Sequence, residues 1–263
     1  MPHKARKRFG QHFLHDASVL SKIVAALPQK PNQHLVEIGP GQGALTSLLL
    51  DHCRHLDVIE IDRDLVKILE ERYAHHEKIT IHSADALSFD YSSLAQREEK
   101  FTLVGNLPYN ISTPLLFHLF EYKSVIDEML FMLQKEVVDR LSAVPGNKRY
   151  GRLSVMAQYH CRIEKCFSVS PGSFNPPPKV TSAVVKLVPY AAPPVSVADH
   201  AVFTQVVSAA FGQRRKTLRN ALKKLLSAEE IASAGIDPKA RAETLTLEDF
   251  ANLTRILQRP DSG

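Results

Sequence analysis

The sequence predicts an α/β fold, built as a doubly wound parallel sheet, followed by a small all-helical C-terminal domain. Through the first two-thirds of the chain, short runs rich in β-branched residues alternate with longer segments of helical periodicity. After a proline-containing break, only helical periodicity remains. With 263 residues, 44% of them hydrophobic, the chain is long enough to bury one full core and to form a smaller second unit.

The strands of the predicted sheet are short apolar runs bounded by turn residues. We expect them at residues 35–38, 56–61, 79–83, 102–105, 128–133 and 183–188. Residues 62–73 are predicted to be a helix because their apolar side chains recur every three or four positions. The prolines of 174–179 lead into the last strand, which we expect to close the sheet. The first domain is therefore placed at residues 1–190.

The tail is predicted to be a separate helical domain. Residues 190–197 contain two adjacent prolines, which neither a helix nor a central strand tolerates well, so they indicate a linker to a domain at 198–263. In the central predicted helix Arg215, Arg219 and Lys223 are four residues apart and share an outward face that suits phosphate groups. The predicted helices of this domain are 202–211, 214–226 and 247–257.

The charge distribution favours an anionic partner. The formal net charge is +5, and the basic residues gather near the N-terminus and near residue 220. Solvated charge runs remain the alternative explanation. The two clusters are Lys4, Arg6, Lys7 and Arg8, and Arg214, Arg215, Lys216, Arg219, Lys223 and Lys224.

The sequence contains no recognisable membrane-spanning or secretory signal. No apolar run approaches the roughly 18 residues of a membrane span, and no hydrophobic signal core follows the basic residues 1–10. We expect a cytoplasmic protein without membrane partners. An organellar transit peptide is disfavoured because residues 9–14 carry a motif of their own.

Metal sites are not predicted. The three cysteines are odd in number and lack CxxC spacing, which indicates a reducing compartment and no structural metal. Four histidines are interpreted as solvated residues in polar, helix-terminal surroundings, with no carboxylate or thiolate arranged to complete a metal site; they are His52, His55, His75 and His76.

A glycine-rich turn follows the first predicted strand. Residues 37–43 read Glu-Ile-Gly-Pro-Gly-Gln-Gly, and glycines such as Gly39 and Gly41 suit a tight turn whose backbone approaches a ligand. With Ala44, the pattern also satisfies the dinucleotide fingerprint, so a nicotinamide cofactor stays open at this step, as does a turn without a ligand.

Three carboxylates at strand ends favour S-adenosylmethionine as the cofactor. Glu37 suits a cationic amino group and would repel a pyrophosphate. Glu60 can accept hydrogen bonds from both ribose hydroxyls, and Asp85 from an adenine amino group. Each carboxylate could instead cap the following helix, the reading we prefer for Asp62 and Asp64.

The tetrapeptide Asn106-Leu107-Pro108-Tyr109 follows the fourth predicted strand, at the edge where such sheets bind ligands. The Asn106 side-chain oxygen and the Leu107 carbonyl could accept the two hydrogens of an adenine N6 amino group, whose lone pair is otherwise delocalised into the ring. Pro108 restricts Leu107 to extended backbone angles, and Tyr109 offers a stacking surface for a base. A simple turn is the alternative.

These motifs resemble the ribosomal RNA adenine dimethyltransferases, specifically the small-subunit enzymes of the KsgA type. The N-terminal motif 8–14, the glycine turn and the tetrapeptide are similar to the family's cofactor and catalytic motifs. Further similar stretches are 132–137, 150–156 and 174–180. The resemblance implies a Rossmann-like methyltransferase sheet and S-adenosylmethionine as cofactor.

The resemblance also implies roles for individual residues. His12 departs from the family, where asparagine is expected, so a side-chain contact there is in doubt whereas a backbone contact would survive. Phe174 is implied as a second stacking partner opposite Tyr109, although it also fits a core phenylalanine beside a proline turn. The implied cofactor-binding residues are Gln11, His12, Leu14, Gly39, Gly41, Glu60, Asp85 and Asn106.

The implied reaction is dimethylation at N6 of two adjacent adenosines near the 3′ end of small-subunit (16S) rRNA, during subunit biogenesis. We expect a monomer that acts on the immature small subunit and not on DNA, with the tail recognising RNA. Three alternatives remain: a DNA adenine methyltransferase, which usually has proline where this chain has Leu107; a ribosome-assembly factor whose methylation is incidental; and a nicotinamide dehydrogenase.

Overall fold

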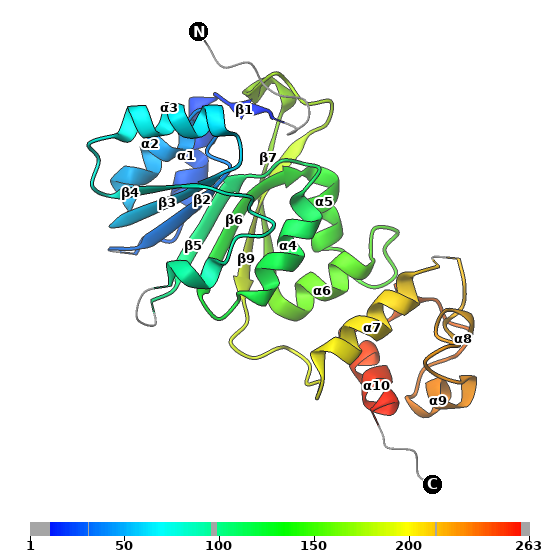
Figure 1. Cartoon of the computed structure of the whole chain (residues 1–263). Coiled ribbons are helices and arrows are strands. Elements are labelled where there is room, and N and C mark those ends of the chain that lie inside the picture. The colour runs from blue at the N-terminus through cyan, green and yellow to red at the C-terminus, as the bar shows by residue number, and fades with distance from the viewer. Residues whose placement is uncertain (1–10, 31, 96–98, 214, 259–263) are drawn as a thin grey trace. The chain divides into compact units, whose positions relative to one another are not determined.

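The structure is a computed structural model that describes residues 11–30, 32–95, 99–213 and 215–258. Its contacts divide the chain into two compact units. The first comprises Met1–Val138 and Arg162–Pro189, and the second comprises Asp139–Cys161 and Tyr190–Gly263. The first unit carries the sheet, and the second consists mainly of helices (Figure 1).

The sheet of the first unit is doubly wound, as predicted. Its neighbouring strands are parallel from β4 to β6, whereas β6 and β9 are antiparallel. From the central β2 the chain moves to β3 and β4, then returns to β5 on the other side of β2. The spatial order, which can be followed in Figure 1, is β4 (Ile79–Ser83), β3 (His55–Glu60), β2 (His34–Ile38), β5 (Phe101–Asn106), β6 (Ile126–Gln134), β9 (Ser182–Pro189) and β7 (Cys161–Val169).

The strands form where the apolar runs predict them, because their side chains fill the core. Leu35, Leu56 and Leu103, on three neighbouring strands, are completely buried, as expected of a parallel sheet covered by helices. The antiparallel pair β1 (Phe13–Leu14) and β8 (Phe174–Asn175) lies apart from this sheet. The helices of the first unit include α1 (Ala17–Ala26), α2 (Ala44–Leu49), α3 (Arg63–Tyr73) and α4 (Ser112–Glu121), with 3-10 turns at Leu50–His52, Tyr91–Leu94 and Pro171–Ser173.

Helix α3 begins where its capping residue predicts. The Asp62 side chain accepts a hydrogen bond from the Asp64 backbone N–H at 3.2 Å, so Asp62 is the N-cap and Asp64 lies in the first turn. The interpretation as a helix cap is therefore confirmed for Asp62 and wrong for Asp64, which lies inside the helix.

The second unit is a set of packed helices that includes residues 139–161. The sequence pattern assigns those residues to a domain at 1–190, but the contacts group them with the tail. Tyr159 lies 4.7 Å from Phe203, centroid to centroid, and the Tyr150 hydroxyl donates to the Leu245 carbonyl at 2.9 Å. The helices are α6 (Arg152–His160), α7 (His200–Phe211), α8 (Leu218–Ala221), α9 (Ala228–Ser233) and α10 (Leu247–Leu257), with a 3-10 turn at Ala242–Thr244; α5 (Lys135–Leu141) crosses the boundary between the units.

The predicted helix at 214–226 is wrong. Within the described part of this range, residues 215–226, α8 (Leu218–Ala221) is the only helix. The backbone N–H groups of Leu218 and Arg219 donate to the carbonyls of Ala240 and Pro238, at 2.8 and 3.0 Å, instead of to carbonyls one turn earlier. A distant segment thus replaces the local helical bonds, and the basic residues of this region do not lie along one continuous helix.

Strand β7 and several helices, among them α1, α4, α6 and α9, have no counterpart among the predicted elements. The basic cluster 4–8, residues 8–10 of the N-terminal motif and Arg214 lie outside the described residues. Among the helices that are described, none has both the length and the apolar character required to cross a bilayer. The expectation that His55 sits at a helix terminus without a nearby carboxylate is also wrong, because His55 begins β3 and lies 3.5 Å from Asp57.

Candidate active site

A cavity of about 550 Å³ opens at the carboxyl ends of the central strands. The doubly wound order reverses between β2 and β5, and ligands bind open α/β sheets at this switch point. The cavity is lined by the turn after β2, by the end of β3 and by the tetrapeptide after β5. Predicted site residues that line it are Gln11, His12, Leu14, Gly39, Gly41, Glu60, Asp85, Asn106, Leu107, Pro108 and Tyr109.

The glycine turn has the backbone conformation that its sequence predicts. Gly39 and Gly41 have φ angles of 68° and 57°, in the left-handed region that other residues rarely adopt. A Cβ on Gly41 would lie 3.0 Å from a ring carbon of Phe13. A side chain at this position would therefore be strained and would press against β1.

Two buried carboxylates stand at the floor of the cavity. The Glu37 side chain, 2% exposed, accepts a hydrogen bond from the Thr46 hydroxyl at 2.6 Å. Glu60 accepts backbone N–H bonds from Asp62 at 2.9 Å and from Gly41 at 3.3 Å. Burial raises the pKa of Glu37 to about 8 and also raises that of Glu60. Both carboxylates are thus held in a setting that a bound cation or hydroxyl donor would stabilise.

Asp85 differs from these two because it is exposed. Its side chain accepts a hydrogen bond from the Leu87 backbone N–H at 2.9 Å and lines the cavity.

Ile61 also lines the cavity, and it is 45% exposed, which is unusual for a large apolar residue. Its position directly after the strand-end Glu60 was the available sequence signal, and the motif reasoning missed it. Arg72, whose Nη1 donates to the Gln42 carbonyl at 2.6 Å, is a second lining residue that was missed.

The N-terminal motif closes one side of the cavity. The Gln11 side chain donates to the Asp62 carboxylate at 3.0 Å. The His12 carbonyl accepts the Asn106 amide N–H at 2.8 Å, and the His12 Nδ1–H donates to the Pro176 carbonyl at 2.7 Å. Leu14 is buried in the adjoining core.

The tetrapeptide is fixed by contacts at both ends. Since the Asn106 Nδ2 faces the His12 carbonyl, its Oδ1 points the other way and can accept a hydrogen bond. The Leu107 side chain is buried, and its N–H donates to the Met132 carbonyl at 3.2 Å. The Tyr109 hydroxyl lies 2.6 Å from the Ser182 hydroxyl, and burial raises the pKa of Tyr109.

The two predicted stacking residues are placed differently. The Tyr109 ring is half-buried and stacks on His12, with 5.7 Å between ring centroids. Phe174 is 2% exposed, belongs to the core cluster around α1 and is not one of the lining residues; its neighbour Asn175 is. The described arrangement thus brings Asn106, Leu107, Pro108 and Tyr109 together but leaves Phe174 behind the cavity wall.

The comparisons with known proteins agree with the motifs. A family model described as "Ribosomal RNA adenine dimethylase" matches residues 2–259. The chain belongs to the ribosomal RNA adenine dimethylase family. The resemblance seen in the motifs is thereby confirmed.

Relatives of this dimethylase are similar along nearly the whole chain. A ribosomal RNA small subunit methyltransferase A of Pseudomonas aeruginosa is 55% identical over 255 residues, covering 97% of this chain and 95% of the relative. The protein of the same name from Acinetobacter baylyi is 56% identical over 252 residues, covering 96% and 92%.

Solved structures share the fold. A dimethyladenosine transferase from Plasmodium falciparum superposes with a TM-score of 0.79 at 26% identity, covering 92% of this chain and 96% of the other. The 23S rRNA methyltransferase ErmE has a TM-score of 0.73, also at 26% identity, with coverages of 94% and 100%. The predicted fold class is confirmed.

Proposed function

We propose that this dimethylase transfers methyl groups from S-adenosylmethionine to N6 of two adjacent adenosines near the 3′ end of small-subunit (16S) rRNA. The product is N6,N6-dimethyladenosine, made while the small subunit matures. The family membership and the names of the relatives support the substrate. The observation that carries the chemistry is the orientation of the Asn106 amide. Its Nδ2–H donates to the His12 carbonyl, which leaves Oδ1 to accept a hydrogen bond from the base.

The residues at the cavity suit S-adenosylmethionine. When bound, this cofactor supplies a methyl group on a positively charged sulfur. Gly39 and Gly41 leave the turn without side chains, so the backbone can approach the ligand. Ionised Glu37 would hold the cationic amino group, Glu60 the ribose hydroxyls, and Asp85 the adenine amino group. Gln11, His12 and Leu14 would enclose it from the N-terminal side.

The exposed Ile61 supports the same assignment. Its side chain lines the cavity directly after Glu60 in the sequence, and it offers an apolar surface that can cover one face of an adenine ring. The residues that contact the ribose and the adenine would then be neighbours in the sequence, with Glu60 at the end of β3 and Ile61 directly after it.

The tetrapeptide would bind the acceptor base. Asn106 Oδ1 and the Leu107 carbonyl would accept the two N6 hydrogens and draw the amino lone pair out of conjugation. Catalysis would then rest on alignment of the reacting atoms. Tyr109 would stack on the extruded base; Phe174 would do so only after a rearrangement that uncovers its ring, which is buried here.

We infer that the second unit, with the tail at 198–263, contacts RNA through phosphates. Within this unit a groove of about 440 Å³ is lined by Lys216, Lys223 and Lys224 together with Gln205 and Asn220. Lysines suit phosphate contacts that position RNA without reading its sequence. Cytoplasmic location, the monomeric state and the absence of DNA or membrane partners remain predictions.

The decisive experiment uses undermethylated small subunits and isotope-labelled S-adenosylmethionine. The wild-type protein should produce N6,N6-dimethyladenosine, detected by mass spectrometry of digested rRNA. Asn106→Ala should abolish transfer, and calorimetry should measure its remaining affinity for the cofactor. No dimethyladenosine from the wild-type protein, or better transfer to duplex DNA, would count against the proposal.

A further inference from the structure

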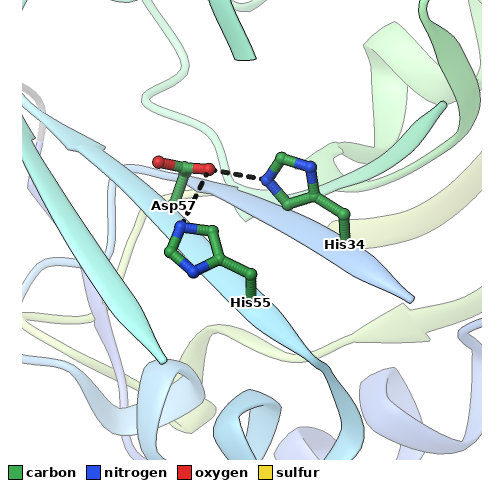
Figure 2. A group of neighbouring side chains, drawn as sticks. All are labelled: His34, His55 and Asp57. Carbon is green, nitrogen blue, oxygen red and sulfur yellow. Dashed lines mark hydrogen bonds and ion pairs between the residues drawn. The ribbon is translucent and has the colours of Figure 1, made fainter. Parts of the chain in front are cut away.

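A cluster of histidines surrounds one buried aspartate at the opposite end of the strands from the cofactor cavity. His34 and His55 are the first residues of β2 and β3 and lie side by side in the parallel register. Asp57 is two residues after His55, so both side chains point to the same face of the sheet. Figure 2 shows the two imidazole rings turned toward the Asp57 carboxylate. None of these residues lines the cavity.

The ring nitrogens converge on the carboxylate. His34 Nε2 lies 2.6 Å from Asp57 Oδ2, and His55 Nε2 lies 3.5 Å from the same oxygen (Figure 2). On the other side, His82 Nε2 of β4 lies 2.6 Å from Asp57 Oδ1. The candidate ligand atoms of His34, His55 and Asp57 are all within 4.8 Å of one another.

Burial makes this arrangement more than a surface ion pair. The side chains of Asp57 and His34 are only 6% and 8% exposed. The Asp57 carboxylate is held by His34 on one oxygen and by His82 on the other, each at 2.6 Å. The buried carboxylate therefore presents its Oδ2 atom to the two imidazoles of His34 and His55.

Two imidazoles and one carboxylate form a donor set that zinc prefers. Zinc lies about 2.0–2.2 Å from nitrogen and oxygen ligands, so tetrahedral ligand atoms are spaced roughly 3.3–3.6 Å apart. The His55–Asp57 separation of 3.5 Å already has this value. The His34–Asp57 pair would open by about 1 Å as the ion takes the place of the proton on His34 Nε2, and the neutral imidazole then carries its proton on Nδ1.

The surrounding residues supply the other requirements of a zinc site. His82 can keep its hydrogen bond to Asp57 Oδ1 and orient the carboxylate as an outer partner. The side chain of His55 is 32% exposed, which leaves a path for the ion and room for water as a fourth ligand.

We propose that His34, His55 and Asp57 bind Zn²⁺ and thereby fasten the amino ends of β2 and β3. The ion would be structural with respect to methyl transfer, because its ligands are separate from the cavity residues. Binding should raise the melting temperature and leave the affinity for S-adenosylmethionine unchanged.

The test uses the full-length protein without a histidine tag, stripped with chelator. Isothermal titration with ZnCl₂ should give one saturable site, and Tm should rise to a plateau at one equivalent. Co²⁺ in place of Zn²⁺ should give the visible absorption bands of tetrahedral coordination. His55→Ala, at the most exposed ligand, should weaken binding at least 100-fold, and His82→Gln about 10–100-fold.

The matched control is His75→Ala, which removes an exposed histidine outside the cluster and should bind zinc as the wild type does. If His55→Ala and the wild type bind zinc with equal affinity, zinc binds at another site, for example at a cysteine, and the proposal is overturned. Absence of saturable binding to folded wild-type protein would overturn it as well. If His55→Ala does not fold, His55→Gln gives the same comparison.

Discussion

Replacing Glu37 by glutamine should stabilise the protein at alkaline pH and weaken its affinity for a cationic cofactor. Glu37 is 2% exposed and accepts a hydrogen bond from the Thr46 hydroxyl at 2.6 Å. Glutamine has almost the same shape and can still accept the Thr46 hydrogen bond. The substitution therefore removes the buried ionisation and little else.

The expected magnitude follows from the pKa of the buried carboxyl. Burial raises the pKa of Glu37 from its ordinary value of 4.5 to about 8. The folded state then keeps a proton that the unfolded chain releases, so the wild type loses stability as pH rises from 4.5 and the loss levels off above 8. Integrating the linkage gives a loss of about 1 kcal/mol at pH 5 and on the order of 4 kcal/mol at pH 8.

Urea unfolding of the wild type and of Glu37→Gln at pH 5 and pH 8 measures the difference between their free energies of unfolding. The chain has no tryptophan, so far-ultraviolet circular dichroism is the suitable signal. Glu37→Gln should exceed the wild type in stability by a margin that grows by roughly 3 kcal/mol between the two pH values. Glu77→Gln, at an exposed position, should show no such growth. A margin that is the same at both pH values would refute the reasoning.

The same variant should bind S-adenosylmethionine at least about tenfold more weakly at pH 8, because a neutral amide cannot pair with the cationic amino group. Calorimetry measures this directly. Unchanged affinity would show that the amino group is held elsewhere, even if the stability prediction succeeds.

Two further substitutions test the packing around the site. Gly105→Ala should destabilise the sheet by roughly 1–3 kcal/mol in urea unfolding, because its Cβ would lie 2.5 Å from the Ile38 carbonyl oxygen; Gly151→Ala, with open space around it, is the control. Tyr109→Phe should cost about 1–2 kcal/mol and lower Tm, because it leaves the buried Ser182 hydroxyl without its partner at 2.6 Å; an unchanged Tm would contradict the importance of that bond.

Much of the site could be predicted because its residues stand directly at strand ends. Gly39, Glu60 and Asn106 lie at or directly after the carboxyl ends of β2, β3 and β5. A parallel sheet brings those ends to one edge, so the cavity follows once the strands are assigned. The apolar runs are strong signals because central strands are buried on both faces.

Local sequence patterns could not predict contacts between segments that are distant in the sequence. The sequence of α6 does not indicate that this helix packs against α7. The structure shows it in the ring contact between Tyr159 and Phe203. The basic segment near residue 220 has helical periodicity, yet its backbone bonds to Pro238 and Ala240 break the helix. The cluster at Asp57 depends on register, because His34 is 23 residues away and faces it only across two paired strands.

The departure at His12 shows why a changed motif residue need not change the site. The contact that orients Asn106 is the His12 backbone carbonyl, which any residue at that position provides. The side chain can therefore differ from the asparagine that the resemblance leads us to expect, and the imidazole contacts the Pro176 carbonyl and the Tyr109 ring. Because the His12 ring stacks on Tyr109, substitution of His12 should affect how readily Tyr109 accepts a base, while the hydrogen-bonding direction of Asn106 stays fixed.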